Sequence, residues 1–484
     1  MKNKVLILFL VLTFISGLPC DILAQNVSTS PLPKTLPLID ADDGAEPMTV
    51  NVSVDWNKVV GTMSPLMWGV CDNEIMSLDD AKDRGFNDYL KSLRRPFIRI
   101  HGAEQVNWVD AAKKSWDPKA VKACFDAADG YEDAVLMITF SMSPDGIKRT
   151  EWGGFATPAD EDRLVQFAAD LVRIMRDTVK RKVDYWEFFN EQDGWNGKEG
   201  VWDKYGKTPE LWRWINKFAV AIKKEDPSVK VGAAAFTLPR PEWIRGLVTQ
   251  CGKNLDFISW HNYATGDAYS TNEFVFGMID EIENTNREAV GIIRNYDPNR
   301  RLKIFLSEYN INWHWEVDDP RMRKSFGAVF DACLLKREAL VGVDGAAIWH
   351  AKNWLYGLIG RENPTKSVKS NQINPSGYLY QWGPAYLVGR IADARIGDPR
   401  SVECLPIIAG NGKSVLLINK TRRTTVVPRA KRLLIPAKGE ALRVMVIDSK
   451  GLSSLRMFEA NSEDLRLRGY SITLMTTVSP EGGR

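Results

Sequence analysis

The sequence has little net charge, few histidines and no regular cysteine spacing. Its 64 Lys and Arg residues are balanced by 61 Asp and Glu, so the net charge of +3 gives no reason to expect a polyanionic partner such as nucleic acid. Only four His occur, and none of the six Cys forms a CxxC pair, so neither a zinc site nor a disulfide framework is indicated. In an oxidising compartment, one or two isolated disulfides are the alternative for the cysteines. No GxGxxG segment follows the first predicted strand, which argues against a dinucleotide site. We therefore expect no metal, no cofactor and no nucleic-acid partner.

Long hydrophobic runs are also missing, except at the N-terminus. Residues 1–24 join a basic start to an apolar run over residues 5–18, the pattern of a signal peptide with a cleavage site near Ala24. The run is too short to span a bilayer comfortably. Cys20 raises the alternative of lipidation, but the proline before it makes a poor lipobox. Residues 25–48 are rich in Pro, Ser, Thr and Asp and are predicted to be a disordered lead-in. These features predict an exported protein, periplasmic or extracellular, with no integral membrane span.

Residues 64–394 alternate short apolar runs with longer amphipathic stretches. Eight runs are predicted to form buried strands: Leu66–Val70, Phe97–Ile100, Val135–Phe140, Val183–Phe189, Val229–Phe236, Asp256–Trp260, Lys303–Leu306 and Gly345–Trp349. Helical spacing of apolar residues follows Pro158, and Thr208-Pro209 is expected to cap another helix. Eight strands alternating with helices predict an α/β fold, a (β/α)8 TIM barrel. A doubly wound parallel sheet is the alternative fold, because its strands and helices alternate in a similar way.

The pattern changes again near the C-terminus. Four short strand-like runs predict a β-sandwich domain over residues 395–484: Ser414–Ile418, Thr424–Val427, Leu442–Val446 and Tyr470–Thr476. The strand-like segment 49–63 is expected to join this domain. Tyr470 is its sole Trp or Tyr, so the domain is expected to support the barrel and not to stack on sugars.

Two of the predicted strands end in a glutamate. An apolar run precedes Glu191, and another precedes Glu308. The C-terminal ends of barrel strands form the catalytic face, and these are strands four and seven, whose ends can approach each other across the mouth. For either residue alone, capping of the next helix is the alternative. Two carboxyl groups about 5 Å apart at a sugar are the equipment of a retaining glycoside hydrolase. We predict Glu191 as the acid/base and Glu308 as the nucleophile.

The segments around these positions resemble the clan A glycoside hydrolases, and most of all glycoside hydrolase family 39, which contains β-xylosidases and related exo-enzymes. The resemblance covers about residues 60–390. The motifs that resemble the family lie in the segments 98–102, 141–144, 186–191, 257–263 and 307–310. It implies an acid/base that follows an Asn after strand four and a nucleophile that ends strand seven. In that family the Asn-Glu pair is usually followed by Pro, whereas Gln192 follows here.

Three polar residues are expected to assist the two glutamates. Arg99 on strand two could hold Glu308 ionised, because an opposite charge favours the carboxylate. A barrel-interior ion pair without a catalytic role is the alternative for Arg99. Asn190 would bind the sugar hydroxyl next to the anomeric carbon, and Tyr263 would donate a hydrogen bond to the nucleophile.

Histidine and tryptophan side chains are expected to line the sugar site. The resemblance implies that His101 lines the glycone subsite, that His261 lies near the nucleophile and that Trp349 forms a platform under the glycone. Structural burial of the histidines and ordinary packing of the tryptophan are the alternatives. The chain has 17 Trp, most of them expected in the core. The cluster 312–315 just after the nucleophile, with Trp313 and Trp315, is predicted to form the aglycone wall.

The sequence thus predicts a retaining glycoside hydrolase that cleaves β-glycosidic bonds by double displacement. Its expected action is exo, in the manner of the β-xylosidases, on an oligo- or polysaccharide from plants or algae. An endo-acting hydrolase with an open cleft is one alternative. A non-catalytic saccharide-binding barrel is another, and the presence of both glutamates argues against it.

Overall fold

The computed structural model describes most of the chain between residues 36 and 479. The described ranges are 36–37, 44–101, 107–110, 112–140, 146–151, 154–194, 201–438, 441–454 and 463–479. The predicted signal peptide with Cys20, most of the predicted lead-in and the segment 141–144 lie outside them. Within these ranges, no helix has the length and apolar character needed to cross a membrane.

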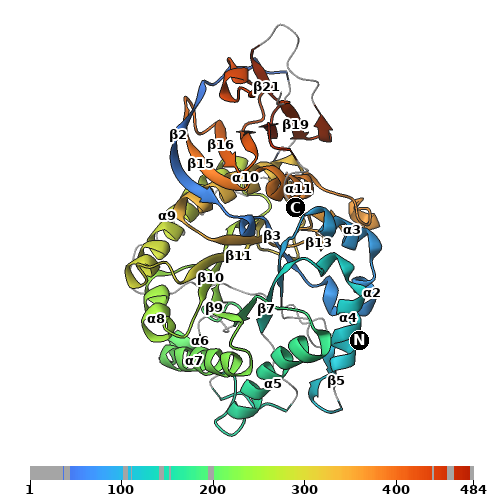
Figure 1. The fold of residues 1–484 in the computed structure, drawn as a ribbon, viewed down its shortest axis with the longest axis vertical. Helices are drawn as coiled ribbons and strands as arrows, with labels where there is room; N and C mark the ends of the chain where they lie inside the picture. Colours follow the sequence, from blue (N-terminus) through green and yellow to red (C-terminus); the bar gives the residue numbers. More distant parts are fainter. Residues whose placement is uncertain are drawn as a thin grey trace, which may run out of the picture.

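Eight parallel strands close into a barrel, which confirms the predicted TIM barrel (Figure 1). In order around the barrel they are β3 (Gly69–Asp72), β4 (Phe97–Ile100), β7 (Val135–Phe140), β8 (Tyr185–Phe188), β9 (Lys230–Phe236), β10 (Phe257–Thr265), β11 (Lys303–Asn312) and β12 (Gly345–Ile348). The first strand starts later than predicted, because Pro65–Trp68 forms a 3₁₀ turn in which the Ser64 hydroxyl accepts a hydrogen bond from the Leu66 amide. Strands β10 and β11 run further toward the C-terminal face than predicted.

Helices surround the barrel and connect its strands. They are α2 (Leu78–Ala81), α3 (Arg84–Ser92), α4 (Pro118–Ala127), α5 (Glu161–Ile174), α6 (Val201–Lys204), α7 (Thr208–Glu225), α8 (Pro241–Cys251), α9 (Asn272–Tyr296), α10 (Ser325–Val341) and α11 (Pro375–Tyr386). Helices α5 and α7 confirm the two predicted from sequence. The cap predicted at Thr208 is wrong, because Thr208 is already the first residue of the helix and Lys207, the residue before it, is the N-cap. Two short strand pairs lie in the loops. β5 (Val109–Asp110) and β6 (Ser115–Trp116) pair antiparallel, whereas β13 (Lys352–Asn353) and β14 (Ile359–Gly360) pair in parallel.

The barrel interior is layered, with aromatic rings below and polar groups above. Phe97, Tyr185, Phe257 and Phe305 pack against one another with ring centroids 5.0–6.3 Å apart. Neighbouring strands make room for these rings with glycine. A Cβ atom at Gly232, for example, would lie 2.4 Å from the ring of Phe257. Because side chains alternate along a strand, the residues two positions further on also point inward, toward the C-terminal mouth.

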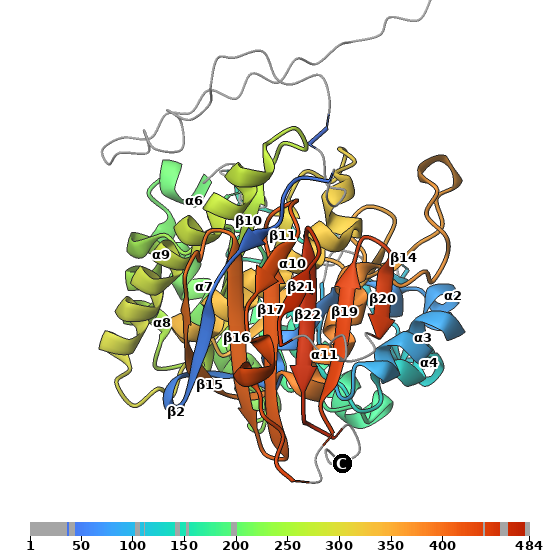
Figure 2. The same cartoon turned by 90° about the horizontal axis from the view of Figure 1, so that it is seen from above.

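The C-terminal domain contains one large antiparallel sheet and one small sheet. The seven strands of the large sheet, in order, are β2 (Val52–Met63), β15 (Gly389–Ile396), β16 (Val402–Ala409), β17 (Gly412–Asn419), β22 (Ser471–Thr476), β19 (Arg443–Asp448) and β20 (Gly451–Ser454). The small sheet contains β1 (Met48–Thr49), β18 (Thr425–Val427) and β21 (Leu465–Leu467). Figure 2 shows β2, in blue, alongside the orange and red strands of the large sheet.

Sequence patterns missed four of these strands, namely β15, β16, β20 and β21. The sheet also begins before residue 395, because β15 pairs with β2 over its whole length. A separate apolar cluster, which includes Val415, Leu417, Val444 and Met475, fills the space between the two sheets.

Helix α10 joins the sheet domain to the barrel. It is buried along almost its whole length, and it packs against the barrel on one side and the large sheet on the other. A helix that is apolar all round requires such cover on every side. This explains why the segment 326–335 shows no polar face.

A buried carboxylate at this junction binds three cations. Glu403 on β16 accepts from Lys336 at 2.9 Å and Arg337 at 2.9 Å, both on α10, and pairs with Lys420 at 3.1 Å. Burial by itself would raise the pKa of Glu403, but the charges of Lys336, Lys420 and Arg337 outweigh burial and lower it to about 2. The ion pairs therefore connect the barrel to the sheet with a charge that is retained at any moderate pH.

Replacing Glu403 with Gln is expected to lower the free energy of unfolding by about 3 kcal/mol near neutral pH, because three cations lose their shared anion. The folded pKa lies below the unfolded one, so this stabilisation is complete above about pH 4.5 and is lost as the pH falls toward 2. Thermal midpoints measured across this range should therefore converge at low pH. Glu463→Gln removes an exposed pair with Arg432 and should change little. A Glu403→Gln deficit that does not depend on pH would contradict this account.

Candidate active site

Arg99 lies at the centre of the site, fully buried on β4. Its Nη1 donates to Glu308 Oε1 at 2.7 Å, its Nη2 to Asn190 Oδ1 at 2.8 Å and its Nε to Glu187 Oε2 at 2.7 Å. The guanidinium therefore uses its planar set of donors on three different partners. Two of these partners, Glu308 and Asn190, were predicted as site residues; Glu187 was not.

Glu187 is buried in the middle of β8, below the mouth. Its Oε2 also accepts a hydrogen bond from the Thr139 hydroxyl at 2.7 Å. Burial opposes ionisation of Glu187, but the Arg99 charge and the Thr139 hydroxyl outweigh it and hold the pKa of this carboxyl below its ordinary value. The signal that could have identified it is a charged residue inside an otherwise apolar strand, two positions after the inward-facing Tyr185.

An irregularity in β11 turns Glu308 into the barrel. The register against β12 shifts between Leu306 and Tyr309, so Glu308 faces inward next to His261. Such a bulge re-aims a side chain. Glu308 Oε2 accepts from the Tyr263 hydroxyl at 2.9 Å, while Arg99 holds Oε1. Both oxygens of Glu308 thus have a donor, and its side chain is 7% exposed.

Glu191 follows β8 in a left-handed backbone conformation. Its φ is +52°, which costs a residue with a side chain about 1 kcal/mol, and its amide is held by the Ala235 carbonyl at 2.9 Å. Its Oε1 lies 2.8 Å from His261 Nδ1. Burial raises the pKa of Glu191 to about 7, even though the charge of Arg99 opposes the shift. A carboxyl with that pKa can hold a proton near neutral pH and give it up.

The predicted histidines and Trp349 surround the two glutamates. His101 Nε2 lies 3.9 Å from Glu308 Oε1, and the His101 ring meets Trp349 edge-on with centroids 5.2 Å apart. Burial lowers the pKa of both His101 and His261, so both rings are neutral at neutral pH. The two histidines therefore add no positive charge to the site at neutral pH.

Glu191, His261 and Glu308 also form a group that could hold a metal ion. One carboxylate oxygen of each glutamate and one nitrogen of His261 lie within 4.8 Å of one another. Carboxylate oxygens and imidazole nitrogens are ligands that divalent metal ions accept, and the same atoms can also bind a proton. The sequence-based prediction that the protein needs no metal stays a prediction.

Gln192, which stands where the family usually has Pro, is built into the turn. Its side-chain amide donates to the Asn190 carbonyl at 3.2 Å, and its oxygen accepts from Trp202 Nε1 at 3.1 Å. A proline could make neither contact. The departure from the family pattern therefore comes with its own hydrogen bonds, which fasten the turn that carries Glu191.

Trp313 lies at the same rim but outside this group. It follows β11 directly, its ring is stacked on His314, and the residue is 50% exposed. Its carbonyl accepts from the Tyr356 hydroxyl at 3.1 Å, and Tyr356 in turn lies beside Trp349. Trp315 is 61% exposed. Exposed aromatic faces of this size are available for stacking.

The five described cysteines lie apart from one another in the fold. Cys71, Cys124, Cys251, Cys333 and Cys404 are all free and buried, so no disulfide forms among the described residues.

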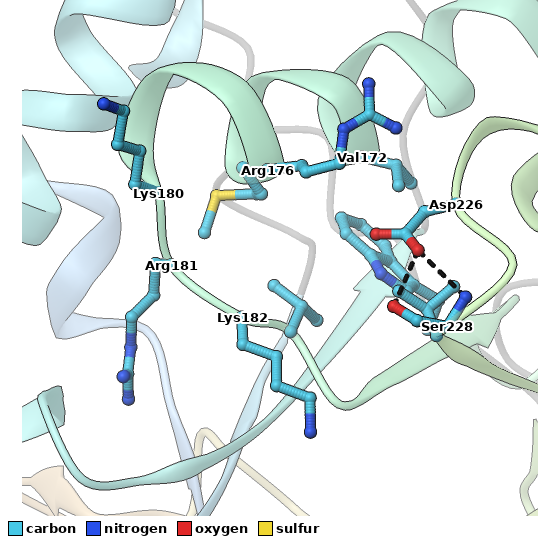
Figure 3. Close-up of a pocket in the computed structure, with 11 residues that line it drawn as sticks. Val172, Arg176, Lys180, Arg181, Lys182, Asp226 and Ser228 are labelled. Atoms are coloured by element: carbon cyan, nitrogen blue, oxygen red, sulfur yellow. Dashed lines mark hydrogen bonds between the residues drawn. The ribbon is translucent and has the colours of Figure 1, made fainter.

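A cavity of about 310 Å³ lies at the opposite end of the barrel, before strands β8 and β9 (Figure 3). Arg176, Arg181 and Lys182 line it, but each donates to neighbouring carboxylates or carbonyl groups. The labelled basic side chains in Figure 3 also point in different directions. The cavity therefore does not provide a convergent charged site, and it is separate from the glutamates.

Comparisons with known proteins agree with this geometry. Residues 156–342, which include β8 through α10, match the family model described as glycosyl hydrolases family 39. Among curated proteins, none matches the sequence.

Solved structures share the fold at low sequence identity. A family 51 arabinofuranosidase from Xanthomonas axonopodis pv. citri is 11% identical, with a TM-score of 0.64 and coverage of 88% of this chain and 99% of that one. A family 39 β-xylosidase from Caulobacter crescentus is 17% identical, with a TM-score of 0.61 and the same coverage. A bifunctional glucanase-xylanase from a metagenome library is 14% identical, with a TM-score of 0.57 and coverage of 89% and 99%.

At these identities the structures establish the fold, while the family match spans the segment that carries both glutamates. The resemblance to the clan A glycoside hydrolases is thereby confirmed, and the protein is a glycosidase whose residues 156–342 match the model of glycosyl hydrolases family 39.

Proposed function

We propose that the protein is a retaining glycosidase in which Glu191 is the acid/base and Glu308 the nucleophile. The observation that carries this proposal is the placement of one oxygen from each glutamate within 4.8 Å of the other. Retaining enzymes hold their carboxyl groups about 5–5.5 Å apart, whereas inverting enzymes separate them by about 6.5–9.5 Å to admit a water. The spacing here leaves room for direct attack on the sugar.

In the first step, protonated Glu191 gives its proton to the glycosidic oxygen while Glu308 attacks the anomeric carbon. The bond to the leaving group breaks, and a covalent glycosyl-enzyme forms. In the second step, the Glu191 carboxylate takes a proton from water, which displaces Glu308. Tyr263 and Arg99 hold the Glu308 carboxylate between steps, and Asn190, fixed by Arg99, faces the sugar.

The proposed substrate is a β-linked plant or algal oligo- or polysaccharide, cleaved by exo action. The β-linkage and the exo action rest on the resemblance to family 39, and the name of the Caulobacter crescentus β-xylosidase supports them. Exposed Trp313 and Trp315 supply stacking surfaces for an aglycone beyond the glutamates. An endo-acting hydrolase is the second candidate, favoured by the likeness to the glucanase-xylanase. The N-terminal pattern supports export to the periplasm or the outside of the cell.

Loss of either glutamate should have a distinct kinetic signature. Glu308→Ala should abolish turnover, and azide should restore it with an inverted glycosyl azide as product, since the small anion fills the place of the missing nucleophile. Glu191→Ala should lose about 10²–10⁴-fold on substrates with poor leaving groups and far less on aryl glycosides that need no protonation. Chromatography and NMR of the products provide the measurement. Wild-type rates in either variant on natural substrate would refute the assignment.

The pH profile of kcat/KM should report Glu191. Because its pKa is raised to about 7, the acid form is present below that pH, and kcat/KM should fall as the pH rises through it. This alkaline limb, the fall of kcat/KM with rising pH, should disappear in Glu191→Ala assayed with an activated aryl glycoside. A limb that persists in that variant would assign it to another group.

Exo and endo action differ in their first products. Exo action should release one small sugar from a chain end from the earliest time points, with the polymer length changing slowly. Trp313→Ala should raise KM for oligosaccharides by about fivefold, because a stacked ring contributes roughly 1 kcal/mol, and should leave aryl monoglycosides nearly unchanged. Trp354, which is partly buried against the core, offers a matched tryptophan control. Early release of mixed oligomers would favour the endo candidate.

A further inference from the structure

Glu187 is a buried carboxylate that the two chemical steps do not use. It is fully buried, Arg99 and the Thr139 hydroxyl donate hydrogen bonds to it, and the side chain of Ser259 also favours its charged form. Burying a carboxylate is costly unless it is paired. An uncharged side chain could fill this point of β8 equally well, so the charge of Glu187 indicates a role beyond packing.

The charges around Glu187 are few. The ionisable groups that face Glu187 and Glu191 are Cys71 on β3, Arg99 on β4, Asp193 after β8, His261 and Tyr263 on β10, and Glu308 on β11. Burial favours the uncharged forms of the thiol, the phenol and the imidazole. Arg99 is therefore a single cation with two carboxylates, one on each side: Glu308 at 2.7 Å and Glu187 at 2.7 Å.

We propose that Glu187 is a positioning residue that acts through Arg99: it shares the guanidinium charge, so that Glu308 remains free to attack and Glu191 remains able to keep its proton. This inference rests on the proposed retaining function. Without the Glu187 charge, Arg99 would attract Glu308 more strongly. It would also favour the anion of Glu191, on which the Arg99 charge already acts.

The hydrogen-bond geometry of Glu187 allows its electrostatic role to be tested separately from its packing. Arg99 Nε and the Thr139 hydroxyl both donate to the same oxygen of Glu187. A glutamine can present a carbonyl oxygen at that position and accept both bonds, so Glu187→Gln changes the charge and little else. Thr139→Val is the matched control, because it removes one hydrogen bond to Glu187 and leaves every charge in place.

The experiment compares pH profiles of kcat and kcat/KM for the full-length wild type and the two variants, with thermal midpoints as a check of folding. In Glu187→Gln the alkaline limb should move about one pH unit toward acid. Its kcat should fall about tenfold with KM nearly unchanged, equivalent to about 1.4 kcal/mol in the chemical step. In Thr139→Val the limb should stay in place.

Each outcome decides the proposal. A folded Glu187→Gln variant with the wild-type limb, or an equal displacement in Thr139→Val, would overturn it. Should Glu187→Gln fail to fold, Glu187→Asp takes its place: it keeps the charge but lengthens the contact with Arg99, so kcat should fall several-fold while the limb stays. An unchanged kcat in that variant would overturn the proposal. Failure of azide rescue in Glu308→Ala would instead reject the retaining function itself.

Discussion

The buried guanidinium of Arg99 is the group on which the site depends. An arginine cannot lose its charge inside a protein, so a barrel that buries one must surround it with acceptors. Here three acceptors come from two strands and one turn. In the mechanism we propose, each has a different role: Glu308 attacks the sugar, Asn190 faces it, and Glu187 balances the Arg99 charge from below. One cation thereby fixes the relative positions of three side chains that are far apart in the sequence.

The layers below explain how that cation stays in place. Interlocked aromatic rings such as Phe97 and Phe305 close the bottom of the barrel, and glycines on adjacent strands admit them. The period of two along each strand then sets a polar side chain directly above each ring: Arg99 follows Phe97, and Glu187 follows Tyr185. A rigid, close-packed floor lets the polar layer hold one arrangement, which is what preorganised catalysis requires.

The C-terminal sheet has a supporting role in this arrangement. It covers α10, the helix that follows β11, and ion pairs of Glu403 connect the sheet to this helix. Removal of the sheet would expose an apolar helix directly behind β11. The domain thus stabilises the strand that presents Glu308, and its poverty in tryptophan and tyrosine fits a structural task.

The amino-acid sequence determined the eight-strand alternation and the two glutamates at strand ends, because both are local patterns: apolar periodicity, and an acidic residue just after an apolar run. It also indicated Arg99 and Tyr263. Only the tertiary structure decided that Glu187 belongs to the site and that a bulge, not simple alternation, turns Glu308 inward. It also decided that β15 joins the sheet. Each of these depends on barrel closure or on strand register, which bring together residues whose separation in the chain leaves no local signature.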